Sequence, residues 1–195
     1  TIDLISEKSD VLYIGCDLNK FDQYKKNQDS QVPLILWNHR WEFDKNPETF
    51  FNTLFKLKNN NINFELAVVG EQFKEYPKIF DKAKQILETN IVQFGFCESF
   101  SEYAQWLWKA DILPVTSNQD FFGISIIEAS YCETYPLLPE RLSYPELFDI
   151  NTNPECFYND EDDLYLKLKG LLVNSIDKPV FNLNKYDWNN IYSVY

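Results

Sequence analysis

The chain contains no methionine, one histidine and five glycines among its 195 residues, and 30 acidic residues outnumber 18 lysines and arginines. The net charge of -12 argues against this chain binding nucleic acid by itself, because phosphate binding needs clustered cations. No apolar run approaches the roughly 18 residues of a membrane-spanning helix, and the first ten residues lack the pattern of a signal peptide. Because the chain begins with threonine and holds no methionine, we expect a piece of a longer protein.

Cysteine is sparse, and its spacing excludes a CxxC pair. The four thiols belong to Cys16, Cys97, Cys132 and Cys156. Such spacing predicts buried free thiols in a reducing compartment rather than a zinc site or a disulfide framework, so we expect a cytoplasmic protein. The acidic run 160–163 superficially resembles a metal motif, but its place before a helical pattern predicts a helix N-terminus instead.

Short apolar runs alternate with helical patterns along most of the chain. Strands are predicted at 33–37, 64–69, 91–94, 112–115, 135–138 and 156–158. Helices are predicted at 47–58, 76–88, 101–110, 123–131 and 160–172, with Asn46 and Ser101 as caps of the first and third. This alternation predicts right-handed βαβ units and an α/β fold, a Rossmann-like doubly wound parallel sheet.

The two ends of the chain lack this alternation of strands and helices. Residues 11–14 form one more strand-like run, and the polar stretch 17–31 predicts a linker. Residues 186–192 predict a short helix rich in large aromatics, which need a surface to cover.

The loop after the first strand carries residues suited to an anionic ligand. Arg40 and Lys45 lie five positions apart beside a helix start; arginine grips phosphate through two hydrogen bonds, and lysine adds a point charge. The alternative is two solvated cations balanced by Glu42 and Asp44. His39 either contacts the same ligand or makes a structural hydrogen bond.

The loop after the fourth strand carries the second candidate group, from Asp120 to Glu128. Gly123 opens a helix, whose free N–H groups favour a phosphate. Glu128 lies in an otherwise apolar helix, where a ligand hydroxyl, solvent or the backbone must satisfy it. In the doubly wound order these two loops meet at the switch point where ligands bind. A dinucleotide oxidoreductase is disfavoured because no GxGxxG follows the first strand, and no P-loop is present.

This combination resembles the donor site of retaining glycosyltransferases built from two Rossmann domains, the GT-B type. That group has an arginine and a lysine five apart, then two glutamates separated by seven residues; Asp120 stands here for the first glutamate. The blocks 37–42, 121–123, 128–132 and 142–148 narrow the resemblance to the tRNA-queuosine mannosyltransferase family. Glu133 stands where that family has a glycine.

The resemblance implies a role for each matching residue. Arg40 and Lys45 would neutralise the donor diphosphate and stabilise the charge that grows as the sugar leaves. Asp120 would hold sugar hydroxyls, and Glu128 would accept from ribose hydroxyls. Further donor contacts are expected from His39, Phe96, Phe121, Phe122, Gly123, Ile124 and Ser125.

The resemblance also implies one half of a GT-B fold with no metal and no cofactor. We divide the chain into the end of an N-terminal domain plus linker (1–31), a nucleotide-sugar-binding domain (32–180) and a crossover helix (181–195). The implied reaction transfers mannose from GDP-mannose to queuosine in tRNA, with the acceptor bound mainly by an N-terminal domain and no membrane involved. Two alternatives stay open: another nucleotide sugar with a glycan or lipid acceptor, and a non-catalytic nucleotide-sugar-binding module. On its own the chain is expected to bind donor and to transfer nothing.

Overall fold

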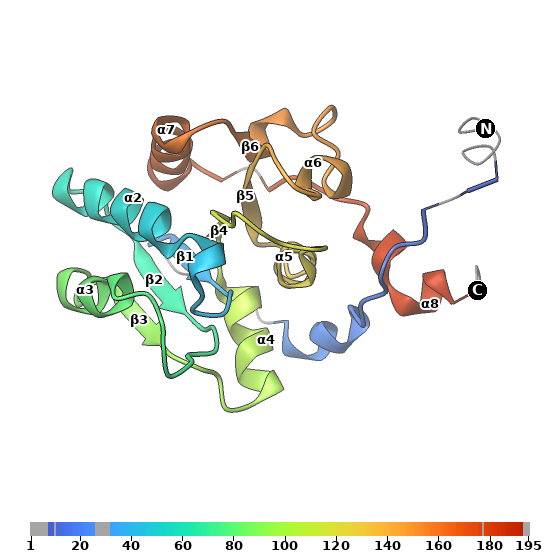
Figure 1. Ribbon diagram of the computed structural model, residues 1–195, viewed down its shortest axis with the longest axis horizontal. Helices are drawn as coiled ribbons and strands as arrows, with labels where there is room; N and C mark the ends of the chain where they lie inside the picture. Colours follow the sequence, from blue (N-terminus) through green and yellow to red (C-terminus); the bar gives the residue numbers. More distant parts are fainter. Residues whose placement is uncertain (1–7, 10, 26–31, 177, 193–195) are drawn as a thin grey trace.

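The computed structural model describes residues 8–9, 11–25, 32–176 and 178–192. In this part of the chain six strands form one sheet in the order β3-β2-β1-β4-β5-β6 (Figure 1). Neighbouring strands all run parallel. The strands are β1 (Leu34–Trp37), β2 (Glu65–Val68), β3 (Ile91–Phe94), β4 (Ile112–Pro114), β5 (Tyr135–Pro139) and β6 (Phe157–Tyr158). The predicted Rossmann-like fold is therefore confirmed.

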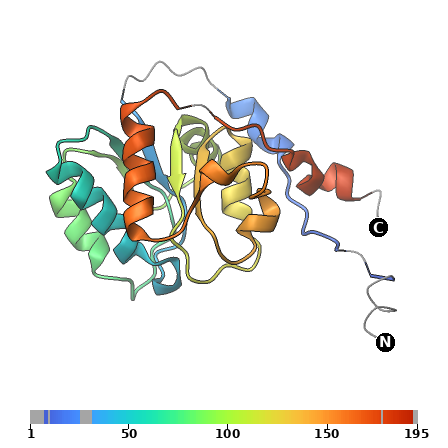
Figure 2. The same ribbon diagram turned by 90° about the horizontal axis from the view of Figure 1, so that it is seen from above.

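Helices cover both faces of this sheet (Figure 2). Helices α2, α3 and α7 pack together on one face, and α4 packs against α5 on the other. Their bounds are α2 (Pro47–Asn59), α3 (Ile79–Ile86), α4 (Phe100–Lys109), α5 (Ile124–Tyr131), α6 (Tyr144–Leu147), α7 (Glu161–Val173) and α8 (Trp188–Ile191). Strands β1, β4 and β5 are buried along their whole length, so they read as nearly continuous apolar runs.

Two predicted helix starts are confirmed. The Asn46 side chain caps α2 by accepting from the Thr49 N–H at 3.4 Å. The acidic run 160–163 opens α7, where the Asp160 carboxylate accepts from the Asp163 N–H at 2.9 Å. Carboxylates at this end are stabilised by the helix dipole.

Two other predicted helix starts are wrong. Ser99, and not Ser101, caps α4, because Ser99 has the extended backbone that a cap needs and accepts from the Glu102 N–H at 3.2 Å. Helix α3 begins at Ile79 rather than at residue 76. Pro77 explains the delay, since a proline disfavours helical geometry in the residue before it.

The predicted strand at 11–14 is also wrong. These residues belong to no helix or strand, and Val11 and Ile14 are 71% and 52% exposed. An extended segment becomes a strand only beside a partner, and none pairs with it among the described residues. The predicted linker 17–31 contains a 3-10 helix, η1 (Asn19–Tyr24), whose Phe21 is fully buried. Residues 26–31 of that linker lie outside the described residues.

The two end segments lie side by side (Figures 1 and 2). Cys16 forms a parallel bridge with Asp187, and the Trp188 N–H donates to the Cys16 carbonyl at 2.9 Å. The predicted aromatic helix at 186–192 is confirmed as the end of η4 (Leu183–Tyr186) followed by α8. The division of the chain at residues 31 and 180 stays a prediction.

All four cysteines are free and buried, as predicted. No helix within the described residues is long and apolar enough to span a membrane.

Candidate functional site

The loops after β1 and β4 meet at the switch point of the sheet. From β1 the chain adds β2 and β3 toward one edge of the sheet, and then returns to add β4, β5 and β6 on the other side of β1. The switch point is the place between β1 and β4. A pocket of about 440 Å³ opens there, which we call the switch-point pocket. It is lined by Ile14, Asn38, His39, Arg40, Lys45, Asp120, Phe121, Phe122, Gly123, Ile124 and Ser125. Nine of these were predicted as donor-site residues; Ile14 and Asn38 were not.

Lys45 is the buried cation of this pocket. Its ammonium group donates to the Gln119 carbonyl at 2.8 Å and lies 3.3 Å from Asp44 and 3.8 Å from Asp120. Only 10% of its side chain is exposed. These partners hold the charge in place, so it is not one of the solvated surface cations of the alternative interpretation.

Arg40 is the exposed cation. Its guanidinium lies 3.1 Å from the Glu42 carboxylate, and 56% of the side chain is accessible. A guanidinium has five N–H donors, and one acidic neighbour leaves several for another anion. Lys45 and Arg40 therefore present positive charge to the pocket from its interior and from its rim.

The start of α5 faces the same pocket. Gly123 has φ 89°, a left-handed conformation that favours glycine. A Cβ at this position would lie 3.3 Å from the Tyr144 ring. The hydroxyl of Tyr144 donates to the Asp120 carboxylate at 3.1 Å. The first N–H groups of α5 have no partner within the helix, which suits them to bind phosphate oxygens.

His39 is buried and neutral. Burial, assisted by the charge of Lys45, lowers the pKa of its imidazole to about 3. Its Nδ1 lies 3.4 Å from the Ser125 hydroxyl, and its Nε2 is buried without a partner among the described residues. The structural hydrogen bond of the alternative interpretation thus exists, and the contact of His39 with a ligand stays a prediction.

Asn38 is a site residue that the sequence reasoning missed. It is 7% exposed, and its Nδ2 donates to the Ser125 carbonyl at 2.8 Å. Its Oδ1 is buried and accepts from no described residue. A polar residue directly after a buried strand was the available signal, because the carboxyl ends of parallel strands are where ligands bind.

Glu128 does not line the switch-point pocket. Its carboxylate accepts from the Tyr103 hydroxyl at 3.1 Å and lies 3.6 Å from the Lys20 ammonium. Burial raises the pKa of this carboxyl, while Lys20 and Tyr103 lower it. Protein groups thus satisfy Glu128 in this state, and its contact with a ribose stays a prediction.

A second pocket, of about 360 Å³, adjoins the first; we call it the β3-end pocket. Its lining consists of Asn38, Arg40, Val69, Gly70, Glu71, Phe96, Cys97, Glu98, Ser99, Phe100 and Tyr103. Asn38 and Arg40 line both pockets, so the two are continuous. Phe96, one of the expected donor contacts, lines this second pocket and is 60% exposed.

Glu133 occupies the left-handed position after α5, with φ 65°. Glycine is preferred at such helix ends, which explains the glycine of the resembled family. Glu133 pairs with Lys25, so the side chain has a surface partner.

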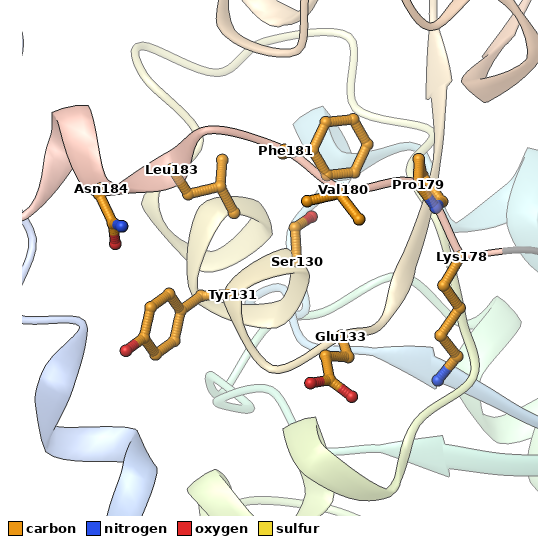
Figure 3. A pocket seen from close by; sticks show the side chains of 9 residues that line it. All are labelled: Ser130, Tyr131, Glu133, Lys178, Pro179, Val180, Phe181, Leu183 and Asn184. Atoms are coloured by element: carbon orange, nitrogen blue, oxygen red, sulfur yellow. The ribbon is translucent and has the colours of Figure 1, made fainter.

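A further pocket of about 320 Å³ lies at the C-terminal end of α5, beside the segment leading to η4 (Figure 3). Its polar side chains belong to Ser130, Tyr131, Glu133, Lys178 and Asn184. No predicted donor-site residue lines it, and it is separate from the other two pockets.

Comparison with known proteins identifies the family of this chain. Residues 19–178 match the family described as glycosyl transferases group 1. The chain is 33% identical over 172 residues to a tRNA-queuosine alpha-mannosyltransferase of Drosophila melanogaster. The match covers 84% of this chain and 44% of the relative, so the chain spans less than half of that protein's length.

Solved structures share the fold at lower identity. A glycosyltransferase from Rickettsia africae superposes with a TM-score of 0.73 at 19% identity, covering 96% of this chain and 55% of that one. The C-terminal domain of a glycosyl transferase group 1 family protein from Francisella tularensis gives 0.61 at 16%, covering 94% and 93%. The match of the family to most of the chain is decisive: the chain belongs to the group 1 glycosyl transferases.

Proposed function

We propose that this chain is the donor-binding domain of a retaining hexosyltransferase that transfers mannose from GDP-mannose to queuosine in tRNA. One observation carries the proposal: Arg40, Lys45 and the start of α5 at Gly123 line one pocket at the switch point. Two cations and a helix N-terminus in one pocket suit a diphosphate.

The proposed chemistry depends on charge. The bond between the anomeric carbon and the diphosphate oxygen breaks, and its electron pair goes to the diphosphate. Fixed cations therefore stabilise the transition state more than the ground state. The Asp120 carboxylate, oriented by the Tyr144 hydroxyl, would accept from sugar hydroxyls. His39, neutral and with Nε2 unpartnered among the described residues, would be a further donor contact.

The choice of sugar and acceptor follows the Drosophila relative, a tRNA-queuosine alpha-mannosyltransferase. The acidic charge of this chain fits an acceptor bound mainly by another part of the protein. The four buried thiols fit a cytoplasmic enzyme.

The test is transfer of mannose from GDP-mannose onto queuosine-containing tRNA by the longer gene product. We expect mannosylated queuosine, detected by mass spectrometry of nucleosides, and no product on tRNA that lacks queuosine. Transfer from a different nucleotide sugar, or onto a glycan or lipid only, would replace the assignment by the related-enzyme alternative. Donor binding without transfer to any acceptor would leave a nucleotide-sugar-binding module.

A matched pair of variants connects the activity to this site. Lys45→Met should abolish transfer, because Lys45 lines the pocket. Lys56→Met should retain it, because Lys56 lies on the outer surface of α2 and pairs only weakly with Asp162 at 3.9 Å. Equal activity of the two variants would refute the assignment of the diphosphate site.

A further inference from the structure

We propose that Lys20 is a positioning residue of the donor site, which holds the Glu128 carboxylate ionised and in place to accept from ribose hydroxyls. The inference rests on the proposed function, because it assumes that a nucleoside diphosphate binds at the switch point and that Glu128 contacts its ribose. It adds a residue of η1, which lines neither pocket of the candidate site and acts on the ligand through Glu128.

Glu128 is held by two side chains that come from different elements. Its Oε1 lies 3.6 Å from the Lys20 ammonium, and its Oε2 accepts from the Tyr103 hydroxyl at 3.1 Å. Only 14% of the Glu128 side chain is exposed. Tyr103 lines the β3-end pocket, so the carboxylate lies one side chain away from that pocket. An ionised carboxylate accepts about four hydrogen bonds, and these two contacts leave acceptor capacity for ligand hydroxyls.

Lys20 is fixed by the way η1 packs on the domain. The 3-10 helix, blue in Figure 1, contacts α4, and Trp108 of α4 donates from Nε1 to the Phe21 carbonyl at 2.8 Å. The Phe21 side chain is fully buried. The Lys20 ammonium lies 4.8 Å from the centre of the Phe100 ring, a distance at which a cation is attracted to the ring face. These contacts keep the cation beside Glu128.

Within the described ranges, Lys20 is the one cation in contact with Glu128. The other titratable groups that face the carboxylate are the Tyr103 hydroxyl and the thiols of Cys16 and Cys132. Burial raises the pKa of Cys16 to about 11 and raises the pKa values of Cys132 and Tyr103 further, so all three groups are neutral near pH 7. Burial also raises the pKa of the Glu128 carboxyl, and the charge of Lys20 is the strongest influence that lowers it. Lys20 thus decides how far into the acid range Glu128 stays ionised.

The ionised form matters because a ribose offers two neighbouring hydroxyl donors. An ionised carboxylate accepts from both, whereas a protonated carboxyl turns one of its oxygens into a donor. Hydrogen bonds to an ionised acceptor are also about twice as strong as those between neutral groups. Protonation of Glu128 should therefore weaken the binding of a nucleoside diphosphate, and removal of Lys20 should bring that protonation to higher pH.

The test is titration calorimetry with GDP at several values between about pH 5 and pH 8. We expect Lys20→Met to bind GDP about tenfold more weakly than the wild type at about pH 7, and to lose affinity in acid at a higher pH. Lys20→Arg keeps the charge and should retain the affinity and the pH profile of the wild type. GDP itself titrates in the same way in every titration, so a difference between variants reports on the protein.

Lys25→Met is the matched control. It removes the same charge from the C-terminal end of η1, but Lys25 pairs with Glu133 and lies over the Trp108 ring. This variant should keep the wild-type affinity and pH profile. A loss in Lys25→Met equal to that in Lys20→Met would reduce the effect to net charge and overturn the proposal.

A double-mutant cycle separates positioning from a general effect on the fold. In Glu128→Gln, whose side chain does not ionise, Lys20→Met should cause no further loss of GDP affinity. A loss of the same size in both backgrounds overturns the proposal, because Lys20 would then act without Glu128. Lys20→Gln, which removes the charge and keeps a hydrogen-bond donor, gives the same comparison where the methionine variant does not fold.

The possible results separate this inference from the proposed function. Absence of GDP binding by the wild type overturns both. Affinity and pH profile unchanged in Lys20→Met overturn the role of Lys20 alone and leave the diphosphate site standing. An affinity loss that is equal at every pH also overturns that role, because it would mark a change of structure and not of ionisation.

Discussion

The ammonium nitrogen of Lys45 lies 3.8 Å from the carboxylate of Asp120, across the switch point of the sheet. The contact joins the loop after β1 to the loop after β4. Its length exceeds that of a hydrogen bond, so an ammonium N–H remains for a ligand oxygen. The Gln119 carbonyl accepts one ammonium N–H, and the contact with Asp120 takes none at hydrogen-bond distance, so the cation keeps a donor for a diphosphate oxygen in the proposed site.

Replacing Lys45 by methionine tests that arrangement. We expect the Kd for GDP to rise about 10- to 100-fold, since a charge-assisted hydrogen bond contributes about 1.5–3 kcal/mol. Titration calorimetry measures the change, and Lys56→Met on the surface of α2 should bind as the wild type does. Unchanged affinity in Lys45→Met would mean that the diphosphate lies elsewhere.

Glu128→Gln separates stability from binding. Burial raises the pKa of the Glu128 carboxyl in the folded chain, so its charged form opposes folding. The loss of stability begins as pH rises past the unfolded pKa of this carboxyl and is complete above its folded pKa. We expect the variant to gain stability relative to the wild type at neutral pH, with a smaller gain in acid, where Glu128 is already protonated. Urea unfolding at the two pH values measures this difference.

The same variant should bind GDP about tenfold or more weakly if Glu128 accepts from the ribose. Tyr131→Phe, which removes a surface hydrogen bond to Asp22 at 2.9 Å, is the control for α5. Affinity retained in Glu128→Gln would assign the carboxylate to the contacts with Tyr103 and Lys20 alone.

Sequence patterns predicted that the loops after β1 and β4 meet, but they did not predict the side-chain contacts around the candidate site. Arg40, Lys45 and Gly123 were predictable because strand spacing and helix starts are local, and the doubly wound order brings their loops together. The Tyr103–Glu128–Lys20 contacts were not, because they depend on how α4 and η1 pack around α5. The strand expected at 11–14 failed for a related reason: an apolar run shows extended preference, whereas pairing needs a neighbouring strand that local sequence does not reveal.

The titration of His39 should appear in the stability of the chain. The pKa of His39 is lowered to about 3 by burial, whereas the unfolded chain titrates near 6.5. Between these values the unfolded state binds a proton that the folded state does not. The free energy of unfolding must therefore fall as pH falls through this window, by at most about 1.4 kcal/mol per pH unit.

His39→Gln should remove that component, so the wild type should lose stability more steeply than the variant between about pH 6.5 and pH 4. Urea unfolding across this range compares the two slopes. NMR gives a direct reading, because His39 is the one histidine of the chain and its ring signals should not shift through pH 6.5. Parallel stability curves, or a titration near 6.5, would contradict a buried neutral imidazole.

Alanine substitutions at Gly70 and Gly170 should change the stability of the fold in opposite directions. A Cβ at Gly70 would lie 1.6 Å from the His39 carbonyl oxygen, a backbone atom that cannot move without displacing the loop that carries Arg40. Gly70→Ala should therefore destabilise the fold, by about 1–3 kcal/mol for an overpacked site, and should weaken GDP binding. Gly170 lies inside α7, and no described atom outside the backbone of that helix lies within 4 Å of its Cβ position. Gly170→Ala should stabilise the fold by about 0.5–1 kcal/mol, because alanine favours a helix interior, and should leave GDP affinity unchanged. Urea unfolding measures the stability of both variants, and calorimetry measures their affinity for GDP. Wild-type stability and affinity in Gly70→Ala would show that the contact between the end of β2 and the loop after β1 does not position the site.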